Sequence, residues 1–168
     1  DQAEALTMST RMAVMIDGKL LQLDTPQQVY DNPSSLQVAQ FVGSPKINTF
    51  DGSSNSEGVV EFLNIKLERK SSESNSNLKI GIRPERLIIS KNKSDNCIEG
   101  SVVYRENLGS DLFFHVDIGD AKNRIIVRGI PQLTNDISNG TKVFIERLKG
   151  EALLFDKSGN RITFKENN

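Results

Sequence analysis

The sequence of 168 residues predicts a mainly β protein, in which a barrel or sandwich of short antiparallel strands follows a short segment of mixed helix and strand. Two observations support this. Before Pro45, helix caps and helix stops punctuate the chain, whereas beyond Pro45 short apolar runs alternate with polar turns. The tripeptide Gly43-Ser44-Pro45 lies at this change. It predicts a boundary between residues 1–43 and residues 44–168.

The first segment begins with a predicted helical turn, because Asp1 is followed three residues later by Glu4, as in a capping box. Residues 11–17 and 19–24 are then predicted to form a β-hairpin. The pair between them, Asp17-Gly18, suits a tight two-residue turn that needs positive φ.

Two short helices are predicted next. Thr25 can cap a helix that Pro26 opens and that runs to about Asn32, with Gln28 completing a capping box. Ser34 or Ser35 can cap a second helix through Phe41, which Gly43 ends. Its apolar face is predicted to hold Leu36, Ala39, and either Val42 or Phe41.

In residues 44–168 the pattern changes to short strands with polar turns. The polar stretches at residues 51–56, 71–77 and 91–96 are interpreted as mobile loops that are too polar to be buried. Alternation over residues 112–118 predicts that Phe114 and Val116 face the core while His115 faces away from it. The predicted strands are residues 47–50, 59–63, 65–68, 79–83, 87–90, 98–106, 112–118, 124–128, 142–147, 152–155 and 161–164.

Charge and composition exclude several classes of function. The 21 Lys and Arg residues nearly balance the 22 Asp and Glu residues, so no broad basic field is available to hold a nucleic acid. The single cysteine, Cys97, cannot form an internal disulfide, and the single histidine, His115, cannot supply a site that needs two imidazoles. No apolar run approaches the roughly 18 to 20 residues of a membrane span.

Catalytic motifs are incomplete throughout the sequence. It contains no GxxxxGK[ST], GxGxxG, HExxH or GxSxG motif and no pair of CxxC motifs. His115 and Asp117 share one strand face and suggest a base with its orienting carboxylate, but a third group is missing, so a histidine at the rim of the strand is the better interpretation. We therefore expect no catalytic residue, no bound cofactor and no bound metal in this chain.

Several strings nevertheless resemble a known family. The run DQAEALTMS, the hairpin with its Asp17-Gly18-Lys19 turn, Thr25-Pro26, Val29-Tyr30 and the run FVGSP at residues 41–45 resemble the end of the ATPase domain in ABC importers of the maltose and glycerol-3-phosphate type. The resemblance implies that the switch histidine of those ATPases would stand just before Asp1. It also implies that ATP and Mg²⁺ are bound by a full-length parent and not by this chain.

The remaining resemblance concerns the transport-associated OB region, called TOBE, of the same subunits. It rests on GIRPERL at residues 81–87, on ENLGS at residues 106–110 with His115-Val116, and on LFD at residues 154–156 with Gly159. The implied fold is an OB-like antiparallel β barrel over residues 44–168, preceded by an α+β remnant of the ATPase domain over residues 1–43. The implied parent is a cytoplasmic subunit, peripheral to the membrane, that powers the uptake of sugars or related solutes.

The resemblance also implies partners: a second copy of the chain, membrane permease subunits through the full-length ATPase, and a regulatory protein. Residues in the three TOBE strings are candidates for the dimer or regulatory contacts, although each also has a purely structural interpretation as a strand exit, a turn or a core residue. An alternative function is an OB-like ligand-binding module for a small oxyanion or an oligonucleotide. The candidate contact residues are Arg83, Pro84, Glu85, Glu106, Leu108, Gly109 and Phe155.

Overall fold

The computed structural model describes residues 10–119, 124–148 and 152–165. In this part of the chain the mainly β fold is confirmed, with strands in three sheets and only short helices. The helix predicted at residues 1–8 lies outside the described residues.

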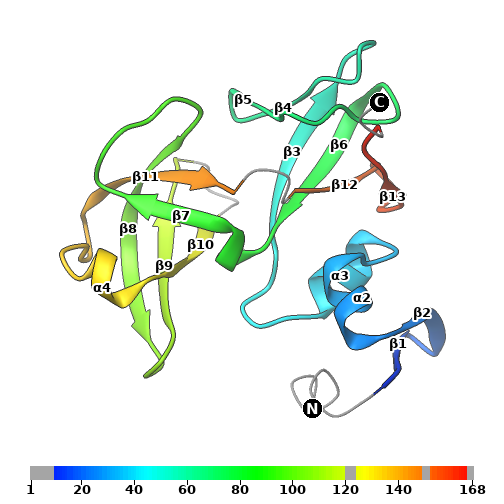
Figure 1. Ribbon diagram of the computed structural model, residues 1–168, viewed down its shortest axis with the longest axis horizontal. Coiled ribbons are helices and arrows are strands. Elements are labelled where there is room, and N and C mark those ends of the chain that lie inside the picture. Colours follow the sequence, from blue (N-terminus) through cyan, green and yellow to red (C-terminus); the bar gives the residue numbers. More distant parts are fainter. Residues whose placement is uncertain (1–9, 120–123, 149–151, 166–168) are drawn as a thin grey trace.

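The predicted hairpin is present as β1 (Met12–Ile16) and β2 (Lys19–Asp24). Its turn has φ 50° at Asp17 and φ 74° at Gly18, which confirms the requirement for positive φ at both positions. Figure 1 shows this hairpin beside the two helices and apart from the larger sheets.

Helix α2 (Pro26–Asp31) begins as predicted, because the Thr25 hydroxyl accepts a hydrogen bond of 3.3 Å from the Gln28 backbone N–H. The capping box predicted with the Gln28 side chain is wrong. That side chain accepts a hydrogen bond from Asn32 instead, and the Thr25 N–H is already bound to Asp24.

Helix α3 (Leu36–Phe41) is capped by the Ser35 hydroxyl and is followed by Gly43 at φ 102°. Val42 is fully buried whereas Phe41 is 43% exposed, so Val42 completes the apolar face. The two helices and the hairpin share a small core made of Met12, Val14, Val29, Val38 and Val42.

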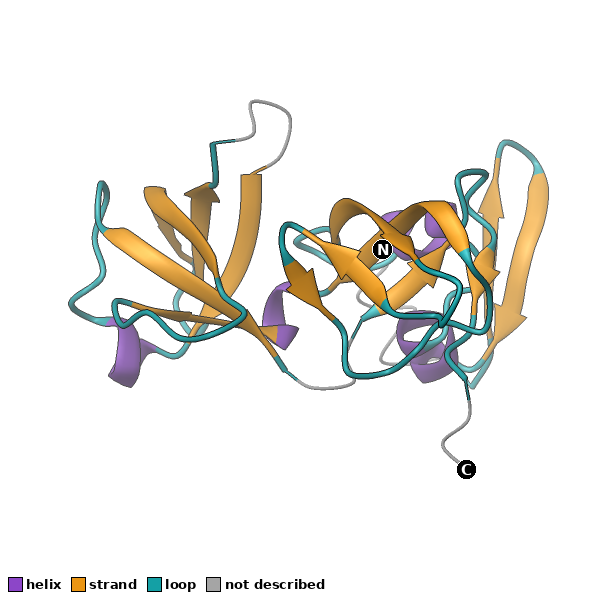
Figure 2. Ribbon diagram, turned by 90° about the horizontal axis from the view of Figure 1, so that it is seen from above, coloured by secondary structure: helices purple, strands orange, loops and turns teal. Residues whose placement is uncertain are grey.

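The predicted barrel is a five-stranded antiparallel sheet with the order β10-β9-β8-β11-β7. Its edge strands β10 and β7 approach each other, so the sheet nearly closes on itself (Figure 2). A short helix, α4 (Pro131–Thr134), joins β10 to β11. The strands are β7 (Leu87–Ser90), β8 (Ile98–Asn107), β9 (Leu112–Asp117), β10 (Arg124–Gly129) and β11 (Lys142–Arg147).

The other predicted strands form a second sheet beside the barrel, with the order β13-β12-β6-β3-β4-β5. Strand β6 leads through a 3₁₀ turn, η1 (Pro84–Arg86), directly into β7 of the barrel (Figure 1). The strands of this sheet are β3 (Asn48–Ser54), β4 (Val60–Phe62), β5 (Ile65–Lys66), β6 (Asn75–Ile82), β12 (Leu153–Phe155) and β13 (Arg161–Ile162).

Two of the polar stretches do not behave as exposed loops, so that prediction is wrong for part of them. Ser54, at the end of β3, is 5% exposed, and Ser71 is fully buried. The Ser54 hydroxyl donates to the Glu73 carbonyl at 2.7 Å and accepts from the Asn75 N–H at 2.9 Å. A small hydroxyl whose hydrogen bonds are satisfied in this way is buried at little cost.

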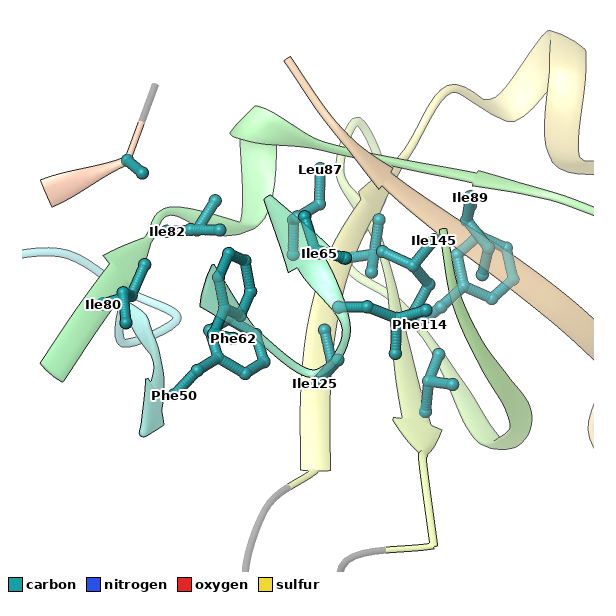
Figure 3. Packing of buried hydrophobic residues seen from close by; sticks show 14 of the residues in the cluster. Phe50, Phe62, Ile65, Ile80, Ile82, Leu87, Ile89, Phe114, Ile125 and Ile145 are labelled. Atoms are coloured by element: carbon teal, nitrogen blue, oxygen red, sulfur yellow. The ribbon is translucent and has the colours of Figure 1, made fainter. Parts of the chain in front are cut away.

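One hydrophobic core runs through both larger sheets. Phe50 and Phe62 of the second sheet pack with ring centroids 5.1 Å apart, and Phe114 fills the barrel. In Figure 3, Ile65 of the β4–β5 hairpin and Leu87 of β7 lie between these two groups. The barrel and the second sheet therefore share buried surface and stabilise each other.

Asn48 adds a polar link between the two sheets. Asn48 is only 7% exposed. Its side chain accepts a hydrogen bond of 2.8 Å from the Ile126 N–H and donates one of 2.9 Å to the Ile126 carbonyl. It also lies 3.2 Å from the Ile82 carbonyl. The amide thus forms hydrogen bonds with the N–H and the carbonyl of one β10 residue, as the backbone of a neighbouring strand would.

Candidate binding cleft

Arg83 sits at the corner where β6 ends and η1 begins, and it is 5% exposed. Its guanidinium donates to the Ala39 carbonyl at 3.0 Å, the Val42 carbonyl at 2.6 Å and the Tyr30 carbonyl at 3.0 Å. These carbonyls lie at the carboxyl ends of α2 and α3, where backbone acceptors have no partner within the helix. One buried cation therefore caps two helices and fastens them to the β region.

This cation is buried against an aromatic ring. The Arg83 guanidinium lies 4.0 Å from the centre of the Tyr30 ring, which is within the range of a cation–π contact. Burial lowers the pKa of Arg83 from its ordinary value, and Tyr30 and Glu85 partly oppose this effect. The predicted contact residue Arg83 is thus engaged inside the chain, and Pro84 beside it is also buried.

Glu85 points to the other side of the same corner. Its carboxylate accepts a hydrogen bond of 2.5 Å from the Tyr30 hydroxyl. Burial, followed by the hydrogen bond to Glu85 and its negative charge, raises the pKa of Tyr30 well above the ordinary value of 10.0. The phenol therefore stays protonated and acts as the donor.

Glu85 lines a cleft between the helical segment and the barrel, with a volume of about 310 Å³. One wall carries the Tyr30–Glu85 hydrogen bond. The other carries Arg128 of β10, which donates to the Asp111 carboxylate at 2.5 Å. We call this feature the corner cleft, and its lining residues are Tyr30, Ser44, Pro45, Glu85, Asp111, Phe113 and Arg128.

The turn between β8 and β9 lies beside the corner cleft. Gly109, at φ 82°, and Leu108, which is 62% exposed, form its tip, and the Leu108 N–H binds the carbonyl of the lining residue Asp111 at 2.8 Å. Glu106 is paired across the strands with the lining residue Phe113. Whether these residues contact a second copy or a regulator stays a prediction.

His115 is held by Glu106 and not by Asp117, which corrects the partner suggested by the sequence. The His115 Nε2 atom lies 3.0 Å from a carboxylate oxygen of Glu106. The imidazole also stacks on the Tyr104 ring, with centroids 4.1 Å apart and an angle of 12° between the planes. Cross-strand pairing puts these groups together, whereas residues two apart on one strand, such as His115 and Asp117, share a face but stand about 6.6 Å apart along it.

Phe155, the last candidate contact residue, is fully buried in a small cluster with Ala39 and Ile47. Arg161 lies over its ring, at 5.6 Å from the centroid. This placement fits the structural interpretation of Phe155 as a core strand residue that joins α3 to the second sheet. A contact between Phe155 and a partner stays a prediction.

Most of the cleft lining was missed by sequence reasoning. Of the candidate contact residues, only Glu85 lines the cleft, while Tyr30, Asp111, Phe113 and Arg128 were not selected as site residues. No local signal marks them, because the cleft forms where residues far apart in the chain meet. Among the described residues no group of three or more His, Cys, Asp or Glu side chains could hold a metal ion, and none of the described helices is both long and apolar enough to cross a membrane.

Residues 80–155 match the TOBE domain family. This chain carries a TOBE domain. The match begins in β6 and ends in β12, so it includes the Arg83 corner, the whole barrel and the Glu85 side of the corner cleft.

Curated relatives extend this similarity over most of the chain, and three of them are ATP-binding proteins of import or uptake systems. The oligosaccharides import ATP-binding protein MsmX of Bacillus subtilis is 34% identical over 70% of this chain and 36% of its own length. The diacetylchitobiose uptake system ATP-binding protein MsiK of Streptomyces coelicolor is 31% identical over 97% of this chain and 48% of its own length. The trehalose/maltose import ATP-binding protein MalK of Thermococcus litoralis is 29% identical over 98% of this chain and 47% of its own length.

The TOBE-containing chain therefore spans less than half of the length of these relatives. Among solved structures, the cytoplasmic molybdate-binding protein ModG shares its fold. The TM-score is 0.53 at 12% sequence identity, over 64% of this chain and 94% of ModG. This likeness confirms the OB-like β architecture that the sequence predicted.

Proposed function

We propose that this chain is the regulatory and dimerisation region of the ATP-binding subunit of an ABC importer for sugars or related solutes. The observation that carries the proposal is the TOBE match over residues 80–155, found within ATP-binding relatives that cover up to 98% of the chain. On this view residues 1–43 belong with the ATP-binding domain, and residues 44–168 form the regulatory region. The parent subunit would work in the cytoplasm, at the inner face of the membrane, with permease subunits.

The proposal includes no catalysis by the chain itself. Cradling a nucleotide phosphate needs a glycine-rich loop with its lysine and a hydroxyl that holds Mg²⁺, and the sequence lacks that motif. We expect calorimetric titration of the chain with MgATP to show no binding in the micromolar range. Micromolar binding would contradict this part of the proposal.

A chimaera tests the transport role. The TOBE segment of Bacillus subtilis MsmX is replaced with residues 80–155 of this chain, and oligosaccharide uptake is measured in cells that lack MsmX. We expect more uptake than with MsmX truncated before that segment. A chimaera that accumulates and binds ATP like MsmX, yet transports no more than the truncated protein, would refute the transport role.

Self-association is tested on the chain alone by sedimentation equilibrium. In a two-fold interface each residue occurs twice, so one substitution acts twice. Leu108→Asp is chosen because Leu108 is 62% exposed at the β8–β9 turn, and Glu57→Lys, in the exposed β3–β4 turn, is the charge control. We expect the wild-type chain to self-associate. Leu108→Asp should weaken this association, whereas Glu57→Lys should leave it unchanged. A monomer at all concentrations would exclude dimerisation by this chain.

A second candidate function is a binding module for a small oxyanion, and the fold shared with the molybdate-binding protein ModG favours it. The corner cleft is not suited to that ligand, because its two carboxylates outnumber its one guanidinium. Titration with molybdate separates the two functions. Tight binding of molybdate would support the oxyanion module. The other OB-type alternative, oligonucleotide binding, is disfavoured by the net charge of -1.

A further inference from the structure

We propose that the corner cleft binds a sugar, that is, a neutral ring carrying several hydroxyl groups. The cleft volume of about 310 Å³ lies at the lower end of the range for small-molecule sites, which suits one or two sugar rings. It opens between two parts of the fold, α2 with the Ser44-Pro45 link on one side and the barrel on the other. Such junctions are common places for ligand sites.

The charges of the lining disfavour an anion and leave only one unbalanced negative charge to attract a cation. Glu85 and Asp111 are negative, Arg128 is positive, and the Tyr30 phenol is neutral, so the lining has a net charge of about -1. An anion would meet two carboxylates, and a cation would meet the guanidinium of Arg128. A neutral ligand pays neither cost.

The same groups supply both kinds of hydrogen-bonding atom that a hydroxyl group needs. Tyr30 binds one oxygen of Glu85, and Arg128 binds one oxygen of Asp111. The second oxygen of Asp111 meets only the Ser110 hydroxyl, at a long 3.5 Å, so both carboxylates keep acceptor capacity. The guanidinium of Arg128 uses one nitrogen for Asp111 and retains further N–H donors. Acceptors on both walls, with donors beside one of them, match the hydroxyl groups of a sugar, each of which donates and accepts.

The cleft also has a small apolar patch that can contact the C–H face of a sugar ring. Phe113 is 7% exposed and lines the cleft together with Pro45. Strand pairing places Glu106 on one side of Phe113 and Arg128 on the other. An aromatic ring flanked by polar groups in this way can pack against a ring that is apolar on one face and polar at its edge.

Both walls carry internal contacts, which limit the side-chain entropy lost on binding. The hydrogen bond between Tyr30 and Glu85 holds one wall, and the ion pair between Arg128 and Asp111 holds the other. Arg83 locks α2 behind the first wall. If the proposed function holds, the ligand is a sugar of the imported class, and the cleft lets the subunit sense the amount already taken up; only this step rests on the proposed function.

The experiment is an NMR titration of the ¹⁵N-labelled chain with maltose and trehalose, and with argininamide and inorganic phosphate as charged probes. We expect both or one of the sugars, and neither charged probe, to shift the amide signals of Tyr30, Asp111, Phe113 and Arg128. No shift with either sugar, shifts confined to other parts of the chain, or stronger binding of a charged probe would each overturn the proposal.

Glu85→Gln and Asp111→Asn test the residues, since each preserves the size of the side chain and an acceptor for its present partner. Hydrogen bonds to charged groups are worth about 1.5–3 kcal/mol, so each variant should weaken sugar binding by at least about tenfold. Glu57→Gln, in the β3–β4 turn, is the matched control and should bind as the wild type does. Unchanged affinity in both cleft variants, with unchanged circular dichroism, would refute the site.

The two proposals fail separately. A chimaera that does not transport, with sugar binding to the chain intact, removes the importer role and leaves the sugar site. A chimaera that transports, with no sugar binding, removes the sugar site alone.

Discussion

Replacing Arg83 with methionine should destabilise the chain and release the helices from the β region. The change removes hydrogen bonds to the carbonyls of Tyr30, Ala39 and Val42 while roughly keeping the volume of the side chain. Hydrogen bonds to a charged donor contribute about 1.5–3 kcal/mol each, so three give about 4.5–9 kcal/mol before any offset. Removing the guanidinium also removes the several kcal/mol that its burial costs, a cost that its lowered pKa reflects.

The net loss should therefore be about 3 kcal/mol in the free energy of unfolding, or about 6–12 °C in Tm for a chain of this size. Urea unfolding followed by far-ultraviolet circular dichroism measures it, since the sequence has no Trp for fluorescence. Hydrogen exchange should show the amides of α2 and α3 less protected, with the barrel amides unchanged. The control Arg69→Met removes only an exposed cation–π contact with Phe164 and should cost about 1 kcal/mol or less. A loss below about 1 kcal/mol for Arg83→Met, or helices that keep their protection, would refute the reasoning.

Two further predictions concern single polar contacts. The raised pKa of Tyr30 means that folding favours the protonated phenol, so Tyr30 contributes stability that is complete below pH 10.0 and is lost as the pH rises above that value. Tyr30→Phe should reduce this alkaline loss of unfolding free energy, measured by urea unfolding at several alkaline pH values. An equal decrease of the unfolding free energy with pH in the two proteins would contradict the prediction. Asn48→Ala should lower the free energy of unfolding by about 2–3 kcal/mol because it leaves the Ile126 N–H and carbonyl without this partner. The control Asn92→Ala, in an exposed loop, should lower it by about 0.5 kcal/mol or less. Equal urea midpoints for the two variants would show that water replaces the Asn48 amide.

Local features of this fold could be predicted from the sequence because neighbouring residues determine them. The Asp17-Gly18 turn and the Thr25 and Ser35 caps depend on one to three residues each. The bounds of β7 and β11 agree with the predicted runs for the same reason, since each strand is built around three successive apolar residues with β-branched members, at 87–89 and 143–145.

Contacts between distant residues could not be predicted in this way. The partner of His115 is Glu106 because β8 and β9 pair in a register with a bulge between Val102 and Tyr104, and no local pattern encodes that register. The burial of Ser71 has the same origin, because Ser71 forms an antiparallel β-bridge with Phe164, which lies far away in the sequence. The candidate cleft depends on five separate segments of the chain and was therefore found only in the structure.

The corner at residues 83–85 combines two tasks that can be separated by mutation. Arg83 points inward to the ends of α2 and α3, Pro84 is buried between, and Glu85 points into the corner cleft. Tyr30 touches both neighbours, since its carbonyl accepts from Arg83 and its hydroxyl donates to Glu85. A ligand that changes the position of Glu85 should therefore also affect the hydrogen bond between Arg83 and the Tyr30 carbonyl, which holds α2. Arg83 substitutions should thus disturb both stability and the cleft, whereas Glu85→Gln should disturb the cleft alone, and this asymmetry is what a mechanical link between the helical segment and the TOBE domain requires.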